Sequence, residues 1–557
     1  MTTWITKSAG EKVAASHIND LQTLKVDKDL LAAFSADYET ANNGVTDDAP
    51  KLRAAMIAAA AAGLELLLED GSYLIASPLV APSNLSMRGR GDNTILVLGA
   101  NCDAISLDGV SNVRIRDLKI DGKSGAYTST ANSAIAGLAG GTGSSDIKIE
   151  NITIVDMAGA NILFLAQTGS HSDHIEILNC NISNAGGNAI ICQDYVDNVV
   201  IRGNRVKGFA AIADNCPAIA SGRSANNSQI IDNYIENTGT SGGNSSHGIS
   251  IEGSNGVVCG NIVKGTRGLG IEVGEANHVA VVGNEVYSTI STGIAVTGSS
   301  GTASTQVAIT GNVVCDPGGI GIYAYGVSDR DAEDIAAVGN TVHNSTDNLG
   351  ILFNYVNKGA IVGNAVTDCH FAGIAITNSH LVDVNANSLA NNNHSGDGAH
   401  KAYTTGSNEG VRINGFLARE SSAHATSGAG EDTLASIVIP QYFYKSYAGL
   451  RVTAMGLKAG AGGNKTLKAY FGTNSFTFHA AANNTSDWRL DWTIHFYQDL
   501  GSFQETSWVG YDGSTVLQGH DETAGDLVAG AITLKLTGEC ADAGDTITQY
   551  GWLVEAF

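Results

Sequence analysis

A period-two alternation of apolar and polar residues recurs along most of this chain. Eight segments align on an asparagine that has an apolar residue three positions before it and another two positions after it. A second alternating pattern, Gly-Ile-x-Ile, follows most of these segments after 10 to 15 residues, as in "GISIEG" and "GIAVTG". Both patterns predict short strands with one buried face. The asparagines are Asn204, Asn233, Asn261, Asn284, Asn312, Asn340, Asn364 and Asn387, at spacings of 23 to 29 residues.

Two or three short strands in each repeat, with no helix between them, predict the coils of a single-stranded parallel β-helix. The repeat begins less regularly, with Leu118, Ile152 and Cys180 in the place of the asparagine. Counted from Leu118 to Asn387, it gives about eleven coils and a stack of roughly 50 Å. We expect the recurrent asparagine to be a turn residue, because Asn tolerates left-handed backbone geometry and stacked amides bond their neighbours. It therefore belongs to the scaffold rather than to catalysis.

A solenoid exposes sheet edges at its ends and needs a cap. The stretch "NNGVTDDAPKLRAAMIAAAAAG" predicts a helix at the N-terminal end, with Thr46 or Asp47 as its N-cap, Pro50 in its first turn and Gly63 at its end.

The composition changes towards the C-terminus, where four of the five tryptophans lie beyond residue 480. Alternating segments such as "GLRVTAMGL" and "WRLDWTIHFY" predict an antiparallel β-sandwich there. Trp488 and Trp492 fall on one face of their strand, so we expect them in the core rather than on an exposed sugar-stacking platform.

The formal net charge of -24 argues against a nucleic-acid partner or an anionic membrane surface, because both need a basic footprint. The opening residues lack the apolar segment of a signal peptide, and no run of about 18 apolar residues occurs, so we expect no membrane insertion. The eight cysteines show no CxxC or CxxH spacing. We interpret them as free thiols of a protein made in a reducing cytoplasm.

The segments "ADYETANNGVTDDAPKLRAAM" and "EDGSYLIASPLVAPSNLSMRGRG" resemble the entry module of the pectate-lyase-like right-handed parallel β-helix superfamily, especially its phage tailspike polysaccharide depolymerases. The resemblance covers about residues 34–420 and specifies the fold rather than the chemistry, because one fold carries many activities. It implies a virion protein made in the host cytoplasm, a homotrimer, and attachment to the phage tail or baseplate through the N-terminal segment. The chain has no counterpart of the Asp-Pro-His-Asp motif of alginate epimerases, and no cluster of Asp ligands like that of calcium-dependent pectate lyases.

The patterns and the resemblance together divide the chain into four parts. We expect an attachment or trimer-nucleating segment at 1–33, the catalytic β-helix at 34–420, a linker at 421–432, and a sandwich for trimerisation or carbohydrate binding at 433–557.

Outward positions of the Gly-Ile-x-Ile strands carry the candidate chemistry. Glu252 and Glu272 share one solvent face on adjacent coils, with backbones about 8 Å apart. Carboxyl groups so placed suit either glycosidase geometry, about 5.5 Å for retention or about 6.5–9.5 Å for inversion. Asp194, two coils earlier, is the third catalytic candidate. The predicted substrate-binding residues are Arg223, His247, Glu275, Tyr323, Tyr325 and Tyr355.

Three functions are compatible with this face. The first is endolytic hydrolysis of a bacterial surface or exopolysaccharide by the carboxylate pair. The second is a polysaccharide lyase, in which a His, Tyr or Arg abstracts the proton beside a uronic carboxylate. The third is a receptor-binding fibre that holds a glycan without cutting it. A bacterial carbohydrate-processing enzyme such as an epimerase is disfavoured by the missing secretion signal. We expect no cofactor and no metal site, with a bound Ca²⁺ as the alternative.

Overall fold

The computed structural model describes most of the chain beyond residue 31. The predicted attachment segment at 1–33 lies almost entirely outside the described residues. Two compact units, residues 1–246 and 247–557, are taken in turn below. The described ranges are 32–138, 142–210, 216–236, 246–298, 302–328, 330–346, 348–392, 402–405, 412–420, 424–426, 429–439, 449–460, 462–482, 485–496, 503–512, 515–524 and 532–556.

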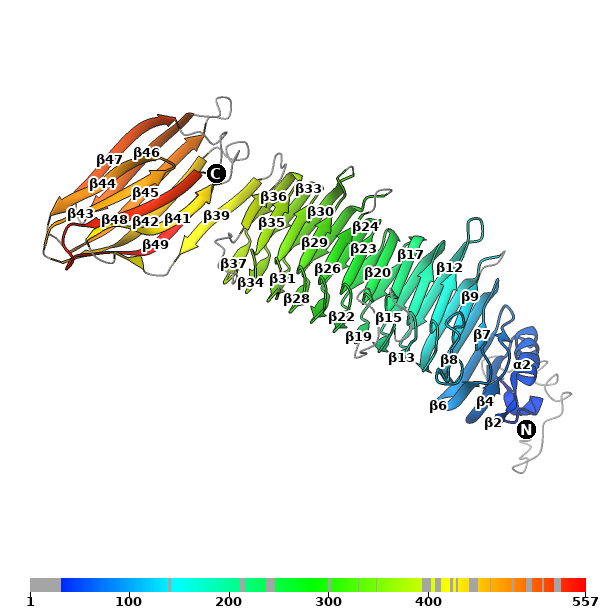
Figure 1. The fold of residues 1–557 in the computed structure, drawn as a ribbon. Helices are drawn as coiled ribbons and strands as arrows, with labels where there is room; N and C mark the ends of the chain where they lie inside the picture. The colour runs from blue at the N-terminus through cyan, green and yellow to red at the C-terminus, as the bar shows by residue number, and fades with distance from the viewer. Residues whose placement is uncertain are drawn as a thin grey trace, which may run out of the picture. The chain divides into compact units, whose positions relative to one another are not determined.

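In the first unit, equivalent strands of successive coils pair in parallel and form three ladders (Figure 1). The first ladder contains β5 (Leu79–Val80), β7 (Ile105–Ser106), β9 (Ile135–Leu138), β11 (Ile162–Leu165), β14 (Ile190–Gln193) and β17 (Ile219–Asn226). The second contains β1 (Ala32–Phe34), β3 (Glu65–Leu67), β6 (Ser86–Leu98), β8 (Ser111–Asp121), β10 (Ser145–Val155), β12 (Ser172–Leu178), β15 (Val196–Arg202) and β18 (Gln229–Ile231). The long strands β6, β8 and β10 bend into the third ladder, which also contains β2 (Asn43–Asp47), β4 (Gly71–Ile75), β13 (Asn181–Ser183), β16 (Arg205–Lys207) and β19 (Tyr234–Glu236).

The second unit continues the same three-strand pattern. Its first ladder contains β20 (Ile249–Ser254), β23 (Ile271–Gly274), β26 (Ile294–Thr297), β29 (Ile322–Tyr325), β32 (Ile351–Asn354), β35 (Ile374–Thr377) and β38 (Ala402–Thr405). Its second contains β21 (Val257–Cys259), β24 (Asn277–Val282), β27 (Thr305–Thr310), β30 (Ala332–Val338), β33 (Val356–Val362), β36 (His380–Asn385) and β39 (Arg412–Glu420). Its third contains β22 (Ile262–Lys264), β25 (Glu285–Tyr287), β28 (Val313–Cys315), β31 (Thr341–His343), β34 (Ala365–Thr367) and β37 (Ser388–Ala390).

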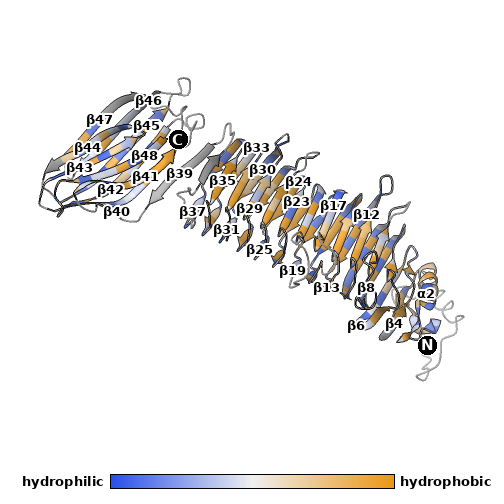
Figure 2. Ribbon diagram, viewed as in Figure 1, coloured by the Kyte–Doolittle hydropathy of each residue, from blue (hydrophilic) through white to orange (hydrophobic). Residues whose placement is uncertain are grey.

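The alternation of side chains creates the core, because every second residue of a strand points inward. Ile249, Ile271, Ile294 and Ile322 stand directly above one another in the first ladder, and all four are fully buried. Figure 2 shows such apolar positions as bands that cross successive strands. Isoleucine suits these places, because its branched side chain packs well on a pleated surface.

The asparagine repeat forms a buried ladder of hydrogen bonds. From Asn204 to Asn233, and at every step from Asn261 to Asn387, the side-chain Nδ2 donates to the Oδ1 of the next asparagine, as from Asn284 to Asn312 at 2.9 Å and from Asn312 to Asn340 at 2.9 Å. Nδ2 also donates to a backbone carbonyl, for Asn312 that of Val281 at 2.9 Å. The scaffold role is therefore confirmed.

The predicted backbone geometry of these asparagines was wrong. None of the eight has a positive φ, and the residue just before each one takes the left-handed conformation instead, as Gly283 does with φ 62° and Gly311 with φ 64°. Glycine turns the corner at the lowest steric cost, and the asparagine can then point into the core.

The N-terminal cap is a helix, α2 (Ala49–Ala62), which follows a short 3₁₀ helix, η2 (Ser35–Tyr38). Pro50 lies in its first turn and Gly63 ends it with φ 66°, as predicted. The N-cap is Asp48, neither Thr46 nor Asp47. The carboxylate of Asp48 accepts hydrogen bonds from the backbone N–H groups of the preceding loop, and the carboxylate of Asp47 accepts one from Ala49 N at 3.1 Å.

The C-terminal part is an antiparallel sandwich, which confirms the predicted fold class. One sheet contains β40 (His424–Ala425), β42 (Gly449–Ala459), β45 (Ser486–Phe496), β46 (Phe503–Asp512), β47 (Thr515–Ala524) and β49 (Thr546–Ala556). The other contains β41 (Gly430–Ile439), β48 (Ile532–Cys540), β43 (Asn464–Phe471) and β44 (Asn474–Ala482). Trp488 and Trp492 are buried in the core of this sandwich, so their predicted packing role is confirmed.

Candidate functional site

Glu252 and Glu272 stand on adjacent strands of the first ladder in the second unit. Strand β20 pairs with β23 so that Ser250 lies opposite Glu272 and Ile251 opposite Val273. Glu252 is therefore the outward residue opposite Gly274, one coil away from Glu272 and two residues further along the strand. The structure brings these two predicted residues together on one face.

Gly274 places no side chain of its own between those of Glu252 and Glu272. A Cβ built on this glycine would lie 3.3 Å from Cγ of Glu252 and 3.8 Å from Cδ of Glu272. Because both distances start from one point, Glu252 Cγ and Glu272 Cδ are no more than about 7 Å apart, so the two side chains are neighbours. The absence of a side chain at Gly274 therefore decides that both carboxyl groups border the same gap.

Hydrogen-bond donors surround the carboxylate of Glu272. The hydroxyl of Ser250 donates to Oε2 at 3.0 Å, and the hydroxyl of Thr297 donates to Oε1 at 3.4 Å. Nε2 of His247 lies 3.7 Å from Oε2. Both oxygens of Glu272 are thus arranged as hydrogen-bond acceptors, and its side chain is only 20% exposed.

His247 is held in one tautomer when it is neutral. Its Nδ1 accepts a hydrogen bond from the backbone N–H of Leu269 at 2.9 Å, so the ring proton is on Nε2, which faces Glu272. Burial lowers the pKa of His247, and the opposing attraction of the Glu272 carboxylate is smaller. The imidazole is therefore neutral at pH 7, with its Nε2–H turned towards Glu272.

An aromatic pair lies further along the same face. Tyr323 and Tyr325 on β29 have ring centroids 5.5 Å apart, with an angle of 33° between the ring planes. Between β23 and β29, strand β26 presents only Ala295 and Thr297 at the matching positions. Burial raises the pKa of Tyr323, so its hydroxyl stays protonated. Two carboxyl groups, a low floor and two tyrosine rings therefore follow one another along the coils.

Glu275 and Tyr355 occupy corners rather than strand faces. Each is the residue that directly follows a first-ladder strand, and each takes a left-handed conformation, with φ 49° for Glu275 and 54° for Tyr355. Their backbone N–H groups donate to Thr297 O and Thr377 O in the next coil. The turn geometry accounts for both positions.

Asp194 and Arg223 lie in the first unit, also directly after or near the end of first-ladder strands. Asp194 directly precedes Tyr195, one of three residues in contact here that the sequence reasoning missed. His171 Nδ1 is 3.0 Å from Asp197 Oδ2, and the rings of His171 and Tyr195 have centroids 5.0 Å apart.

Asn226 fixes the other oxygen of Asp197, donating to Oδ1 from its backbone N–H and from its Nδ2, each at 2.9 Å. Asp194 and Tyr195 are consecutive left-handed residues, with φ 52° and 58°. Such backbone strain is found more often at functional positions. The sequence signal was the separation of 26 residues between His171 and Asp197, which is about one coil.

Among the described residues, no group of three or more His, Cys, Asp or Glu side chains could hold a metal ion. None of the described helices is long and apolar enough to span a membrane. No disulfide occurs in the described part of the chain, and burial raises the pKa of Cys180 to about 12 and that of Cys369 to about 11. These thiols are therefore unreactive packing groups.

Several solved structures are similar to this chain. Solved structures similar to this chain include the A-module of the Azotobacter vinelandii mannuronan C-5 epimerase AlgE6, with 18% identity, a TM-score of 0.48, and 68% of this chain and 97% of that chain covered. They also include the Streptococcus pneumoniae surface adhesin PfbA, with 15% identity, a TM-score of 0.47, and 67% of this chain and 93% of that chain covered. A third is the Dettilon tailspike protein, with 15% identity, a TM-score of 0.47, and 94% of this chain and 100% of that chain covered. No curated protein matches the sequence.

The family model described as "right handed beta helix region" matches residues 136–314. This stretch contains the strands from β9 to β28 that form the regular coils. The right-handed β-helix fold that the resemblance implied is thus confirmed for these coils.

Proposed function

We propose that this chain is a phage tailspike depolymerase that binds a bacterial surface or exopolysaccharide and hydrolyses it endolytically at Glu252 and Glu272. The observation that carries the proposal is the gap over Gly274, which both carboxylic side chains border. The open, shallow face suits a long polymer, because a chain can lie across it without threading an end into a cavity.

The environments of the two carboxyl groups suggest different roles. Glu272 accepts hydrogen bonds from two hydroxyl groups, which suits the carboxylate that activates a water molecule or attacks the anomeric carbon. Glu252 would then be the acid that protonates the glycosidic oxygen. His247 acts on Glu272 rather than on the sugar, since its Nε2 points at the Glu272 carboxylate.

The tyrosine pair supplies a binding surface two coils from Glu272. Sugar rings stack on aromatic side chains through their C–H faces. At a coil step of about 4.8 Å, Tyr323 is roughly 10 Å from Glu272 along the stack, so the polymer would run parallel to the axis of the second unit. Asn354, opposite Tyr325 in the next coil, adds hydrogen-bonding capacity.

The place of this activity in a virion rests on the resemblance of the entry module. On that basis the protein is a homotrimer, which would bury one side of each β-helix around a threefold axis. It would be made in the host cytoplasm and attached to the tail or baseplate through residues 1–33.

A second candidate function is a polysaccharide lyase at the corner of the first unit, favoured by the imidazole of His171 that Asp197 orients. In β-elimination, the imidazole would take the proton beside a uronic carboxylate, while the bond to the leaving oxygen breaks and a C=C bond forms. Tyr195 would return a proton to that oxygen, and the exposed guanidinium of Arg223 would bind the carboxylate.

The deciding experiment incubates the protein with bacterial capsular and exopolysaccharides and follows polymer size together with the ultraviolet absorbance of unsaturated uronates. We expect shortening without that absorbance, abolished in Glu252→Gln and Glu272→Gln and retained in the corner variant Glu275→Gln. Shortening with the absorbance, lost in His171→Ala, would replace hydrolysis by elimination. Binding without shortening would support a receptor-binding fibre instead.

A further inference from the structure

The second ladder of the first unit carries a groove on the strands β10, β12, β15 and β18. Its cavity volume is about 580 Å³. Two columns of side chains line it. The first runs Lys148, Glu176, Val200 and Gln229, which are directly aligned partners in successive strands. The second contains His174, Asn198 and Asn227, which project from a left-handed corner of each strand.

The groove is long enough for an oligosaccharide. Four coils at about 4.8 Å per step span roughly 14 Å, which is the length of about three linked pyranose rings. Its volume also falls within the roughly 300–1,000 Å³ that small-molecule sites enclose.

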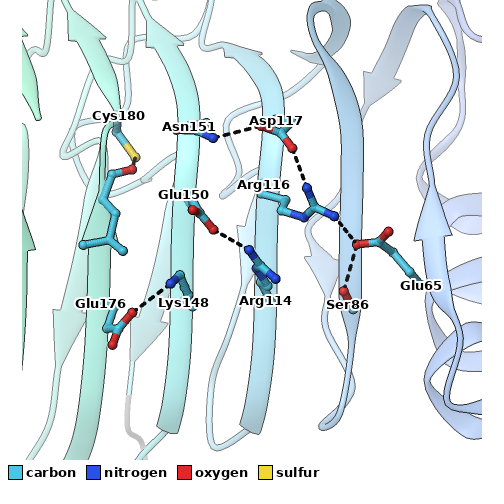
Figure 3. Close-up of polar contacts among 11 residues, drawn as sticks. Glu65, Ser86, Arg114, Arg116, Asp117, Lys148, Glu150, Asn151, Glu176 and Cys180 are labelled. Carbon is cyan, nitrogen blue, oxygen red and sulfur yellow. Dashed lines mark hydrogen bonds and ion pairs between the residues drawn. The ribbon is translucent and has the colours of Figure 1, made fainter. Parts of the chain in front are cut away.

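Several charged groups in and beside the groove form ion pairs, and Asp146 adds a further carboxylate to the lining. Lys148 Nζ lies 3.2 Å from Glu176, and His174 Nδ1 lies 2.7 Å from Asp173 (Figure 3 draws the first of these). On the preceding coils of the same face, Arg114 pairs with Glu150 at 2.7 Å. The lining holds two carboxylates, Asp146 and Glu176, and one lysine, Lys148, so an anionic polymer such as a nucleic acid is disfavoured.

The remaining lining groups offer both donors and acceptors. Asn227 Nδ2 donates to Asn198 Oδ1 at 3.0 Å, and Asn198 Nδ2 donates to Asp173 Oδ1 at 2.6 Å. These contacts order the amides, while Gln229 at the end of the groove is exposed. Val200 supplies an apolar floor between polar walls. A neutral sugar matches this combination, because its hydroxyl groups can bond the polar walls while the C–H face of its ring packs on the apolar floor.

A second protein copy is a poorer occupant of this groove. Protein interfaces need an apolar centre. The exposed large apolar residues of the described first unit are Phe34, Val45, Ile57 and Val80, and none of them lies on the four lining strands.

From these observations we infer that the groove over β10, β12, β15 and β18 is a second saccharide site, which holds a neutral oligosaccharide segment without cleaving it. The inference rests on the proposed function only in that the ligand is a glycan. Glu176 of this site is paired with Lys148, and the site is separate in sequence from Glu252 and Glu272. It would keep the protein on the polymer between cleavage events.

The test measures binding to an array of bacterial capsular polysaccharides, O-antigens and exopolysaccharides. The variant Val200→Trp fills the groove while keeping a strand-forming residue, and Gln229→Ala removes one hydrogen-bonding group. The matched control is Ala308→Trp, at an outward position of the second ladder in the second unit. Glu272→Gln is included to keep cleavage from depleting the glycan.

We expect at least one glycan that the wild type and Ala308→Trp bind alike, that Val200→Trp binds at least tenfold more weakly, and that Gln229→Ala binds roughly fivefold more weakly. If both groove variants bind every glycan as tightly as the wild type does, the inference is overturned. It is also overturned if the wild type binds no glycan on the array. Retained cleavage in Glu272→Gln overturns the proposed hydrolysis alone and leaves the groove result standing.

Discussion

Replacement of Asn312 by alanine should destabilise the second unit strongly, because four buried hydrogen bonds are lost at once. The side chain is fully buried. Its Nδ2 donates to Val281 O and to Asn340 Oδ1, and its Oδ1 accepts from the backbone N–H and the Nδ2 of Asn284, all at 2.9 Å. At about 1 kcal/mol for each net hydrogen bond, the loss is about 4 kcal/mol. The buried groups left without partners raise this figure further.

Asn387→Ala is the matched control at the end of the ladder. Asn387 is half-buried and makes three such bonds, donating to Ile361 O at 2.8 Å and accepting two from Asn364 at 2.9 Å. Water can replace part of them there, so we expect a loss of about 2 kcal/mol or less.

Equilibrium unfolding in guanidinium gives the global effect, and hydrogen exchange of the peptide containing Asn284 gives the local one. The local measurement matters because coils depend mainly on their neighbours. The Asn284 amide should exchange much faster in Asn312→Ala than in wild type. Equal stability of the two variants within about 1 kcal/mol, with unchanged exchange at Asn284, would refute the reasoning that the ladder stabilises the solenoid.

Three further predictions concern acid titration and the gap between the carboxyl groups. Burial lowers the pKa of His247, so the unfolded chain binds the proton first as pH falls below about 6.5, and the native state loses stability there. In thermal unfolding, His247→Asn should therefore lose less stability between pH 7 and pH 5 than the wild type. The pKa of Glu431 is lowered to about 2, because hydrogen bonds and a nearby lysine outweigh the opposite effect of burial. The ionised carboxylate therefore stabilises the native state above about pH 4.5, and this contribution disappears as pH approaches 2. Glu431→Gln should therefore be less stable than wild type at pH 6 and equal to it near pH 2 in guanidinium unfolding; a constant difference across this range would contradict the assignment. Gly274→Ala should cut turnover at least tenfold, because its methyl group enters the gap beside Glu252 and Glu272, while the melting temperature changes little.

Much of the architecture could be predicted from local patterns. Alternation with period two gave the strands, and the spacing of residues such as Asn312 and Asn340 gave the coils, because each coil repeats one buried position of each kind. The predicted eleven coils agree with the described third-ladder strands from Leu118 onward, five in the first unit (β8, β10, β13, β16 and β19) and six in the second. The offset between Glu252 and Glu272 also followed from the register of the repeat.

Other features depend on how the coils stack. The spacing of residues does not show that His247 turns its Nε2 to Glu272, because this contact depends on a hydrogen bond from Leu269 in the next coil. Similarly, His171 meets Asp197 because corners of adjacent coils superpose. Loop length varies between coils, so contacts at corners cannot be read from sequence spacing alone.

The sequence by itself determined the strands, the buried asparagine ladder, the capping helix and the tryptophan core, because these depend on periodic burial and on local turn chemistry. The tertiary structure decided where chemistry can occur. It set the gap at Gly274 between two carboxyl groups, and it aligned Lys148, Glu176, Val200 and Gln229 along one groove. Both sites combine side chains from different coils, and only the stacking register brings such side chains within a few ångströms of one another.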